Sequence, residues 1–416
     1  MRIRGDFDWL ILITTFVLCV VGLGLIYSVF HPHANGYTEP VSNAYFIRQL
    51  IWLTVGIGAL LAGFLVPFRI YEALAYVFYG IGVILLIAVL FVKGGPQAQR
   101  WIALGPLRLQ PSEFMKIALL FVWARVLSGQ RRGGSDRARK VFLAFAFSVI
   151  PFLLILKQPD LGTAIVLFVI VFPVLYWRGV KGYQIFFFLS PLVTILLVIY
   201  GEKITSNPWP FGIYIVFIFI IAYWKRSDLK ASLSLVTSNL GIALIFPYVW
   251  LRLKAYQQDR ILSFLAPGSN RLDQGWQVFQ SKIAIGSGGL SGKGFFLGTQ
   301  KALEFLPAKH TDFIFSVLGE EVGFLGALLV LILFTVLIVR ALVLGDKAKS
   351  EFASTVCIGI AAYFFFQVFI NVAMTTGMAP VTGIPLPFLS YGGSSLVVSC
   401  FFVGFLLNCS VRWYEY

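Results

Sequence analysis

The run DWLILITTFVLCVVGLGLIYSVF, from Asp8 to Phe30, carries a charge only at its first residue. It is long enough to cross a bilayer as a helix, which takes about 20 apolar residues. Such runs recur along nearly all of the 416 residues, of which 59% are hydrophobic and only 12% charged. Backbone groups in hydrocarbon must be satisfied within the structure, and the alternating segments typical of a β-barrel are absent from this sequence. We therefore predict an all-α, polytopic integral membrane protein without a sizeable soluble domain.

The first run also has features of a secretory signal sequence, because Arg2 and Arg4 precede it. It is too long for one, lacks a small-residue cleavage site and is followed by further runs, so we expect an uncleaved first helix. The cysteines lie within apolar runs and lack the spacing of metal ligands, which predicts buried thiols; they are Cys19, Cys357, Cys400 and Cys409.

The apolar runs predict a helical bundle of about twelve transmembrane helices. Their predicted ranges are 8–30, 46–66, 71–92, 111–128, 141–156, 161–177, 184–200, 210–224, 231–251, 313–340, 352–377 and 391–411. Arginine and lysine are concentrated in alternate short connections, which by the positive-inside rule places both termini in the cytoplasm. We expect residues 1–416 to form a single membrane domain.

Two connections on the expected outer side are also basic. The 93–110 connection carries Arg100 and Arg108 and has no acidic residue, and the large 252–312 loop before the last three predicted helices has an excess of basic residues. A basic outer surface beside a membrane attracts pyrophosphate or anionic lipid headgroups. An ordinary solvated loop is the alternative interpretation.

Glu113 and Lys116 lie three residues apart near the start of the predicted helix 111–128, so they share a face of that helix. Unpaired charge inside a bilayer is costly, and ionisable residues within a span are therefore functional candidates. The alternative is an ion pair that only holds the bundle together.

Asp160 follows a proline in KQPDLGT and precedes an apolar run, so a helix N-cap is as plausible for it as a role in a site. Asp312 ends the polar part of LEFLPAKHTDFIF, residues 303–315, at the boundary between water and lipid. It is a candidate catalytic carboxylate, with an N-cap of a helix from Phe313 as the alternative. Glu320 lies eight residues further on, close to the same face, and we expect Lys116 or Arg100 to be its partner.

The stretch GSGGLSGKG, from Gly286 to Gly294, is not a nucleotide-binding P-loop, because Ser287 and Gly294 occupy positions that require glycine and a hydroxyl residue. We expect its glycines to permit tight turns and a close approach of the backbone to a ligand.

The stretch VTGIPLPFLSYGGSS, from Val381 to Ser395, contains Pro385 and Pro387, which cannot continue a regular helix. Irregular backbone at membrane depth occurs where it is buried in protein or lines a wet cavity. Ser394 is a candidate hydrogen-bond donor to a phosphate there.

Four runs in this order resemble the SEDS family (shape, elongation, division and sporulation), and its elongation members more than its division members. They are RWIALGPLRLQPSEFMKIAL, KQPDLGTA, QSKIAIGSGGLSGKGFFLGTQKALEFLPAKHTDFIFSVLGEE and VTGIPLPFLSYGGSS. Members of the family usually have about ten spans. We therefore expect the surplus helices to be an added hairpin within 184–251, and we transfer no residue role to that range.

The resemblance implies a peptidoglycan glycosyltransferase that polymerises lipid II at the outer face of the inner (cytoplasmic) membrane during elongation and rod-shape maintenance. It implies that Asp312 is the catalytic base. Arg100, Arg108 and Lys116 would stabilise the undecaprenyl pyrophosphate leaving group. The other residues that we expect to bind substrate are Asp160, Glu113, Lys282, His310, Glu320 and Ser394.

The implied partners are lipid II, the undecaprenyl-pyrophosphate-linked glycan, membrane lipid and a class B penicillin-binding protein that acts as the transpeptidase; no nucleic acid is among them. A divalent cation, Mg²⁺ or Mn²⁺, is compatible with the chemistry, but no carboxylate cluster in the sequence requires it. Two alternatives stay open. The chain is a lipid II flippase or transporter in one, and a non-catalytic scaffold for a transpeptidase in the other.

Overall fold

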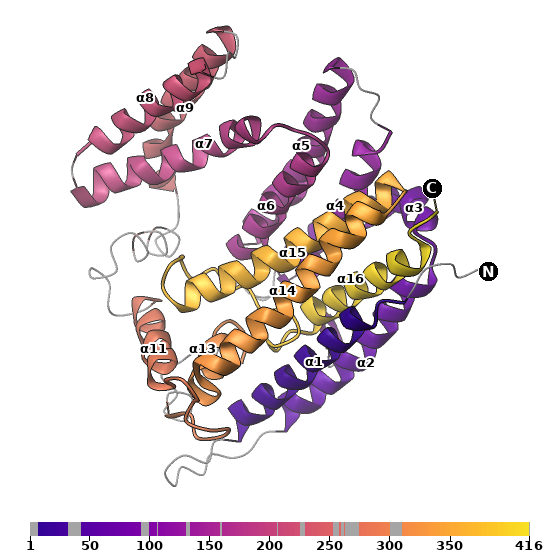
Figure 1. Cartoon of the computed structure of the whole chain (residues 1–416). Helices are drawn as coiled ribbons and strands as arrows, with labels where there is room; N and C mark the ends of the chain where they lie inside the picture. The colour runs from indigo at the N-terminus through magenta and orange to yellow at the C-terminus, as the bar shows by residue number, and fades with distance from the viewer. Residues whose placement is uncertain are drawn as a thin grey trace. The chain divides into compact units, whose positions relative to one another are not determined.

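The computed structural model describes residues 7–31, 43–92, 100–105, 107–129, 134–158, 160–205, 207–224, 229–252, 258, 262, 274–299 and 310–415. These ranges are predominantly helical (Figure 1). Nine of the described helices are long and apolar enough to cross a membrane, and two further apolar helices are shorter. The predicted class, an all-α polytopic membrane protein, is confirmed, whereas the number of spans stays a prediction.

The helices lie at α1 (Trp9–Phe30), α2 (Ala44–Leu65), α3 (Phe68–Leu90), α4 (Pro111–Leu127), α5 (Gly134–Lys157), α6 (Leu161–Trp177), α7 (Gly182–Ile199), α8 (Trp209–Trp224), α9 (Leu229–Arg252), α11 (Gln274–Ser287), α13 (Ile314–Glu321), α14 (Gly323–Lys347), α15 (Glu351–Thr375) and α16 (Gly393–Arg412). A π-helical turn, η2 (Tyr200–Thr205), follows α7, and two short strands, β1 (Ile102–Leu104) and β2 (Leu107–Leu109), precede α4.

The chain divides into two compact units, residues 1–178 with 277–416, and residues 179–276. The second unit contains α7, α8 and α9. Within it, Asn239 on α9 accepts from Thr194 at 2.7 Å and donates to the Ser190 hydroxyl at 3.0 Å, both on α7. The predicted extra hairpin falls in this unit, and its status as an addition stays a prediction.

The first unit is built around α4, α15 and α16. Nearly all residues of α16 and most residues of α15 are buried within the protein. Helices α2 and α16 run side by side (Figure 1) and approach each other closely through Gly63 and Gly404. A β-carbon at Gly63 would lie 2.6 Å from the Phe401 carbonyl oxygen, so glycine is what permits this contact. Small residues serve helix packing in membranes because lipid supplies no hydrophobic force between helices.

The single helix predicted over 313–340 is wrong, because the chain forms two helices there. Helix α13 ends at Glu321, and α14 begins at Gly323 with a φ of +74° at that residue. This left-handed conformation is favourable only for glycine. The break leaves α13 as a separate element of 8 residues directly after Asp312.

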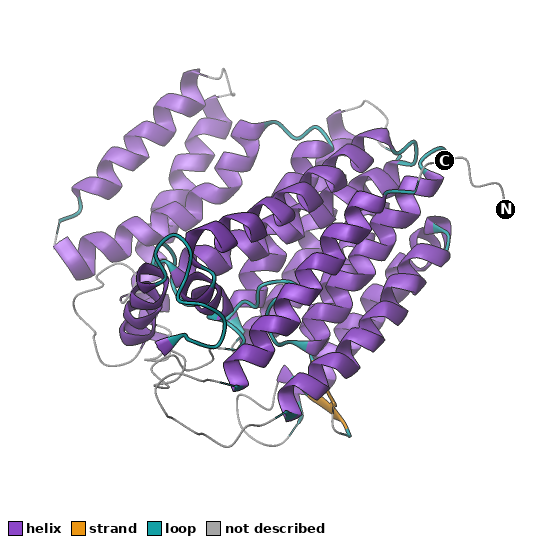
Figure 2. Cartoon of the chain, turned by 60° about the horizontal axis from the view of Figure 1, so that its bottom comes forward, coloured by secondary structure: helices purple, strands orange, loops and turns teal. Residues whose placement is uncertain are grey.

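A short β-hairpin forms within the 93–110 connection, where the sequence patterns predicted only a loop. Strands β1 and β2 pair antiparallel, with Ala103 opposite Arg108, and they are the strands drawn in orange in Figure 2. Gly105, with a φ of +63°, lies in the turn between them. The hairpin leads through Gln110, the N-cap residue, into α4.

Candidate functional site

Asp312 lies in a turn, residues 310–313, that leads into α13. Asn371 on α15 donates from Nδ2 to the carbonyl oxygen of Asp312 at 3.0 Å. Ser390 donates from Oγ to the carbonyl oxygen of Thr311 at 2.6 Å. The backbone of the turn is therefore bonded both to α15 and to the segment that precedes α16.

The Asp312 side chain is half-buried, and its carboxylate lies beside Gly383. A β-carbon at Gly383 would be 3.3 Å from Asp312 Oδ2, and the φ of this glycine is +72°. Phe313 occupies the N-cap position of α13, which begins at Ile314. The structure thus differs from the predicted alternative, in which Asp312 caps a helix that starts at Phe313.

Lys116 and Glu113 form an ion pair inside the protein, with 2.6 Å between Nζ and Oε1 and 2% of each side chain exposed. The Lys116 ammonium lies 5.4 Å from the centre of the Tyr363 ring. With its amide oriented to satisfy both groups, Gln367 accepts from Lys116 Nζ at 2.8 Å and donates to the Pro385 carbonyl oxygen at 3.0 Å. The predicted Glu113–Lys116 pair is confirmed, and it is bonded through Gln367 to the segment before α16.

Asp160 is the N-cap of α6, as one of the two interpretations predicted. Its Oδ1 accepts from the Thr163 backbone N–H at 3.3 Å, and its Oδ2 accepts from Gln110 Nε2 at 2.8 Å. The Gln110 backbone N–H in turn donates to Ser394 Oγ at 2.9 Å. Gln110 therefore links Asp160 to Ser394, and the Ser394 oxygen accepts a hydrogen bond at this contact.

The residues 381–391 form an irregular segment that lies beside the Asp312 turn, packs on the start of α6 and is bonded to Lys116 through Gln367. Asn371 donates to the Ile384 carbonyl oxygen at 2.7 Å, next to the Pro385 contact with Gln367. At Gly162 in α6 a β-carbon would overlap the Thr382 carbonyl oxygen, so the segment packs directly on the start of that helix. The prediction of irregular backbone is confirmed. The segment thus lies close to residues that are far apart in the sequence, namely Asp312, Lys116, Asp160 and Ser394.

Arg100 precedes the β-hairpin, and Arg108 lies on its second strand. Arg100 is half-buried and donates from Nε to the Gln158 carbonyl oxygen at 2.9 Å, which ties the hairpin to the end of α5. Arg108 on β2 is exposed. The two arginine side chains therefore differ in exposure, and Arg108 is the more accessible to a ligand.

His310 belongs to a cluster of partly exposed rings beside two arginines. Its ring centre lies 5.3 Å from that of Tyr45 and 5.8 Å from that of Tyr391. The Arg48 guanidinium lies over the Tyr45 ring, 5.9 Å from its centre. Burial raises the pKa of the Tyr391 hydroxyl, and the nearby charges of Arg48 and Arg108 act in the opposite direction. His310 and Arg48 thus lie against the Tyr45 and Tyr391 rings, and the charge of Arg108 acts on Tyr391 as well.

The sequence analysis missed Arg48, Gln367 and Asn371. Arg48 stands near the start of the predicted helix 46–66, where a cation at an expected outer boundary is the available signal. Gln367 and Asn371 are amides within the apolar run of α15, and both are fully buried. A buried amide needs hydrogen-bond partners, and its presence in a span marks a polar contact.

Two predicted site residues lie elsewhere. Glu320 does not pair with Lys116 or Arg100; its Oε1 accepts from Lys293 Nζ at 2.8 Å. The exposed Lys282 lies against Gly377, just beyond the end of α15, where a cation interacts favourably with the helix dipole. The prediction that Lys116 or Arg100 is the partner of Glu320 is therefore wrong, whereas substrate-binding roles for Glu320 and Lys282 stay predictions.

Within the described ranges, no three side chains of His, Cys, Asp or Glu are grouped so that they could hold a metal ion. The contacts around Asp312, Lys116 and Asp160 are hydrogen bonds and ion pairs.

The model of the FtsW/RodA/SpoVE cell cycle proteins matches residues 8–211 and 210–415. The chain belongs to this family. The peptidoglycan glycosyltransferase MrdB of Escherichia coli is 35% identical over 353 residues, which cover 84% of this chain and 81% of that protein. The peptidoglycan glycosyltransferase RodA of Treponema pallidum is 32% identical, over 99% of this chain and 100% of that protein.

A solved structure of a family member matches the fold. It was determined in work on the structural coordination of polymerization and crosslinking by a peptidoglycan synthase complex. The TM-score is 0.70 at 29% identity, and the match covers 99% of this chain and 99% of that chain. The resemblance to the SEDS family, which these relatives represent, is confirmed.

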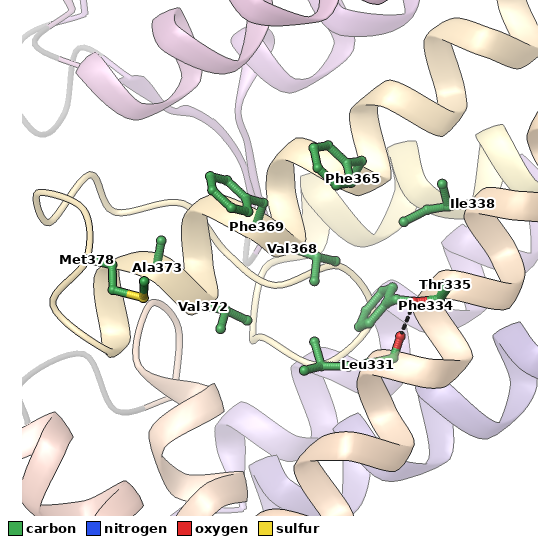
Figure 3. Close-up of a pocket in the computed structure, with 10 residues that line it drawn as sticks. All are labelled: Leu331, Phe334, Thr335, Ile338, Phe365, Val368, Phe369, Val372, Ala373 and Met378. Carbon is green, nitrogen blue, oxygen red and sulfur yellow. Dashed lines mark hydrogen bonds between the residues drawn. The ribbon is translucent and has the colours of Figure 1, made fainter.

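A groove of about 340 Å³ lies apart from the Asp312 site, between α14 and α15 (Figure 3). Its lining is apolar apart from Thr335, whose hydroxyl donates to the Leu331 carbonyl oxygen at 2.8 Å. None of the predicted site residues lines it. The lining residues are Leu331, Phe334, Thr335, Ile338, Phe365, Val368, Phe369, Val372, Ala373 and Met378.

Proposed function

We propose that this chain is a peptidoglycan glycosyltransferase that polymerises lipid II into glycan strands at the outer face of the inner membrane during cell elongation. Its family and the activity named for the relatives support this proposal. The observation that carries it is the half-buried Asp312 carboxylate, held beside Gly383 in a turn whose neighbouring surface bears two arginines.

Asp312 acts as the general base. In the reaction, the 4-hydroxyl of an acceptor GlcNAc attacks the anomeric carbon of a donor MurNAc, and Asp312 takes the hydroxyl proton. The new C–O bond forms as the C–O bond to the pyrophosphate breaks, and its electron pair leaves with undecaprenyl pyrophosphate. An α-linked donor that yields a β-linked product requires one displacement with inversion and no covalent enzyme intermediate.

The departing pyrophosphate requires positive charge where its negative charge develops. Arg108 and Arg48 are exposed on the surface that includes His310, and they are our candidates for direct contact with the phosphates. Arg100 supports the same loop through its bond to Gln158. Arginine suits this role because its planar fork matches phosphate oxygens in a bidentate way.

Lys116 is buried in the protein and acts on the site indirectly. Its ammonium is buried and paired with Glu113, so in this arrangement it reaches the site through Gln367 and the Pro385 carbonyl oxygen. We assign Lys116 and Glu113 the positioning of the 381–391 segment, against which the Asp312 carboxylate lies. Gln110 links Asp160, at the start of α6, to Ser394, at the start of α16, and the start of α6 packs on the same segment through Gly162.

We further propose a class B penicillin-binding protein as partner and the inner membrane, with both termini cytoplasmic, as location. The solved relative comes from work on a complex that coordinates polymerization with crosslinking, which supports a transpeptidase partner. Lipid-linked substrates and products enter and leave sideways through the bilayer, so the site must be open between helices.

The test is polymerisation of purified lipid II in detergent by the full chain with its cognate transpeptidase. Wild type is compared with Asp312→Asn, Asp312→Ala and the control Arg340→Met. The control removes the ion pair between Arg340 on α14 and Asp8, in which the nitrogen and oxygen atoms lie 2.6 Å apart. We expect glycan strands from wild type and the control, and none from either Asp312 variant. Asp312→Asn keeps the size of the side chain and removes only its basicity.

Two outcomes count against the proposal. Strands from Asp312→Asn at the wild-type rate would refute the assignment of the base. No strands from wild type, together with translocation of lipid II in proteoliposomes, would establish a flippase instead.

A further inference from the structure

Residues 287–299, which we call the glycine strap, are bonded backbone to backbone across the break between α13 and α14. The Lys293 and Gly294 N–H groups donate to the carbonyl oxygens of Glu320 and Glu321, both at 3.0 Å. In the other direction, the Phe324 N–H donates to the Gly289 carbonyl oxygen at 2.9 Å. The strap thus satisfies backbone groups that the helix break leaves without an intrahelical partner.

The glycines of the strap permit this contact. A β-carbon at Gly288 would overlap the Gly319 carbonyl oxygen, and one at Gly292 would overlap that of Glu321. Gly292 also has a φ of +81°, in the left-handed region. The close approach that we predicted toward a ligand is, at these glycines, an approach to the chain's own helices.

The Glu320 carboxylate is the polar centre of this contact. It is fully buried, and its Oε1 accepts from Lys293 Nζ at 2.8 Å, from the Thr299 N–H at 2.8 Å and from the Thr299 hydroxyl at 3.0 Å. All three donors belong to the strap. Hydrogen bonds to a charged acceptor are roughly twice as strong as those between neutral groups, so this carboxylate anchors the strap at two points.

Helix α13 connects this anchor to the site. Glu320 lies near its C-terminal end, and the Asp312 turn precedes its N-terminal end. On the same helix, the Ser316 and Ser281 hydroxyl groups are 2.6 Å apart, which ties α13 to α11. This helix of 8 residues is held at its far end by the Lys293–Glu320 ion pair together with the backbone hydrogen bonds of the strap, so a tilt at that end is transmitted to the residues before its start.

We propose that Glu320, with Lys293, is a positioning residue for the reaction of Asp312. The ion pair holds the strap on the α13–α14 break and thereby sets the orientation of α13 and the place of the Asp312 carboxylate. This inference rests on the proposed function, and it gives Glu320 no contact with substrate.

The test compares Lys293→Met and Glu320→Gln with Arg340→Met. The control removes a different ion pair, between Arg340 on α14 and Asp8 at the start of α1, which involves no residue of the strap or of α13. Rates are expressed per folded protein, and the Tm of each variant is measured. We expect the strap variants to lower kcat by ~100-fold with KM for lipid II within about twofold, since a misplacement of about 1 Å has that cost. The control should lower Tm and keep kcat.

The double variant Lys293→Met/Glu320→Gln removes the uncompensated charge that Lys293→Met leaves buried. We expect it to recover Tm relative to Lys293→Met while kcat stays low, because neutrality is restored and the anchor is not. Equal kcat losses in the strap variants and the control would overturn the proposal, as would unchanged kcat in Glu320→Gln.

Hydrogen exchange separates this inference from the proposed function, because it needs no activity. We expect the amides of 310–316 to exchange at least about tenfold faster in Glu320→Gln than in Arg340→Met, which corresponds to a loss of about 1.4 kcal/mol of local stability. Equal exchange in the two variants would refute the positioning role even where wild type polymerises lipid II. Faster exchange in a protein that does not polymerise would instead count against the glycosyltransferase.

Discussion

The Asp312 carboxylate lies beside Gly383, in space that a side chain at Gly383 would crowd. A β-carbon there would lie 3.3 Å from Asp312 Oδ2, closer than most such atoms come to a neighbour. The glycine also has a φ of +72°. Two residues that lie far apart in the sequence, Asp312 and Gly383, therefore set the environment of the candidate base together.

Gly383→Ala should lower kcat by at least about tenfold, because the methyl group crowds the carboxylate and the left-handed backbone costs ~1–2 kcal/mol. Gly129→Ala is the matched control, since Gly129 has a φ of +66° and open space around its Cα. Polymerisation rate and Tm are measured for both. The same loss of rate in both variants would show that backbone strain alone is responsible.

Asn371→Ala should reduce activity through the backbone of the Asp312 turn. It leaves the carbonyl oxygens of Asp312 and Ile384 without this donor, at about 1–3 kcal/mol for each buried group. Asn408→Ala is the control, because Asn408 on α16 also donates to two carbonyl oxygens, those of Gly63 and Val66, away from the site. Both variants should lower Tm, and only Asn371→Ala should lower kcat.

Arg48→Met should weaken binding of undecaprenyl pyrophosphate, about tenfold for the loss of one charged contact worth roughly 1.4 kcal/mol. Lys181→Met should change it less than about twofold, because the exposed Lys181 lies in the compact unit 179–276, to which we assign no site residue. Affinity is measured at two salt concentrations, and the wild-type affinity should fall more steeply with salt than that of Arg48→Met. Equal effects of the two substitutions would point to a general surface potential.

Lys116→Met should destabilise the protein by about 3–5 kcal/mol, because it leaves Glu113 buried without its partner. The double variant Glu113→Gln/Lys116→Met should recover much of this loss. Thermal unfolding of wild type, Glu113→Gln, Lys116→Met and the double variant measures the coupling free energy between the two side chains. Additive losses would mean that the two side chains do not depend on each other.

Gly404→Ala tests the packing of α2 on α16. The methyl group would overlap the Leu60 carbonyl oxygen, and overpacking costs ~1–3 kcal/mol. Gly58→Ala on α2 has open space around it, and the gain in helix propensity of about 1 kcal/mol should leave Tm unchanged or higher. A fall in Tm at Gly58 as large as that at Gly404 would contradict the packing argument.

Features local in sequence were predictable. The run from Asp8 to Phe30 predicted α1, and Pro385 and Pro387 predicted the irregular segment. The spacing of Glu113 and Lys116 predicted their pair, since three residues is a contact distance on a helix. In each case the physical cause lies within one element.

Contacts between distant elements were not predictable in the same way. Helical periodicity placed Glu320 on the face of Asp312, but the partner that neutralises it, Lys293, lies on the strap. The break at Gly323 was missed for the same reason, because the apolar pattern continues through it and only the packed strap requires it. Arg48 is a site candidate because it lies near Tyr45 and Tyr391. Tyr391 is far from it in the sequence, so no local sequence pattern predicts their proximity.

The burial of all four cysteines has a practical consequence for following substrate in this protein. Cys19, Cys357, Cys400 and Cys409 are shielded from water-soluble thiol reagents. Leu290, in contrast, is 71% exposed on the glycine strap, and its backbone alone contributes to the helix contact. A fluorophore attached to Leu290→Cys would therefore label the full chain at one place, without removal of any native cysteine. Its emission would report in real time when a lipid-linked sugar arrives near α13.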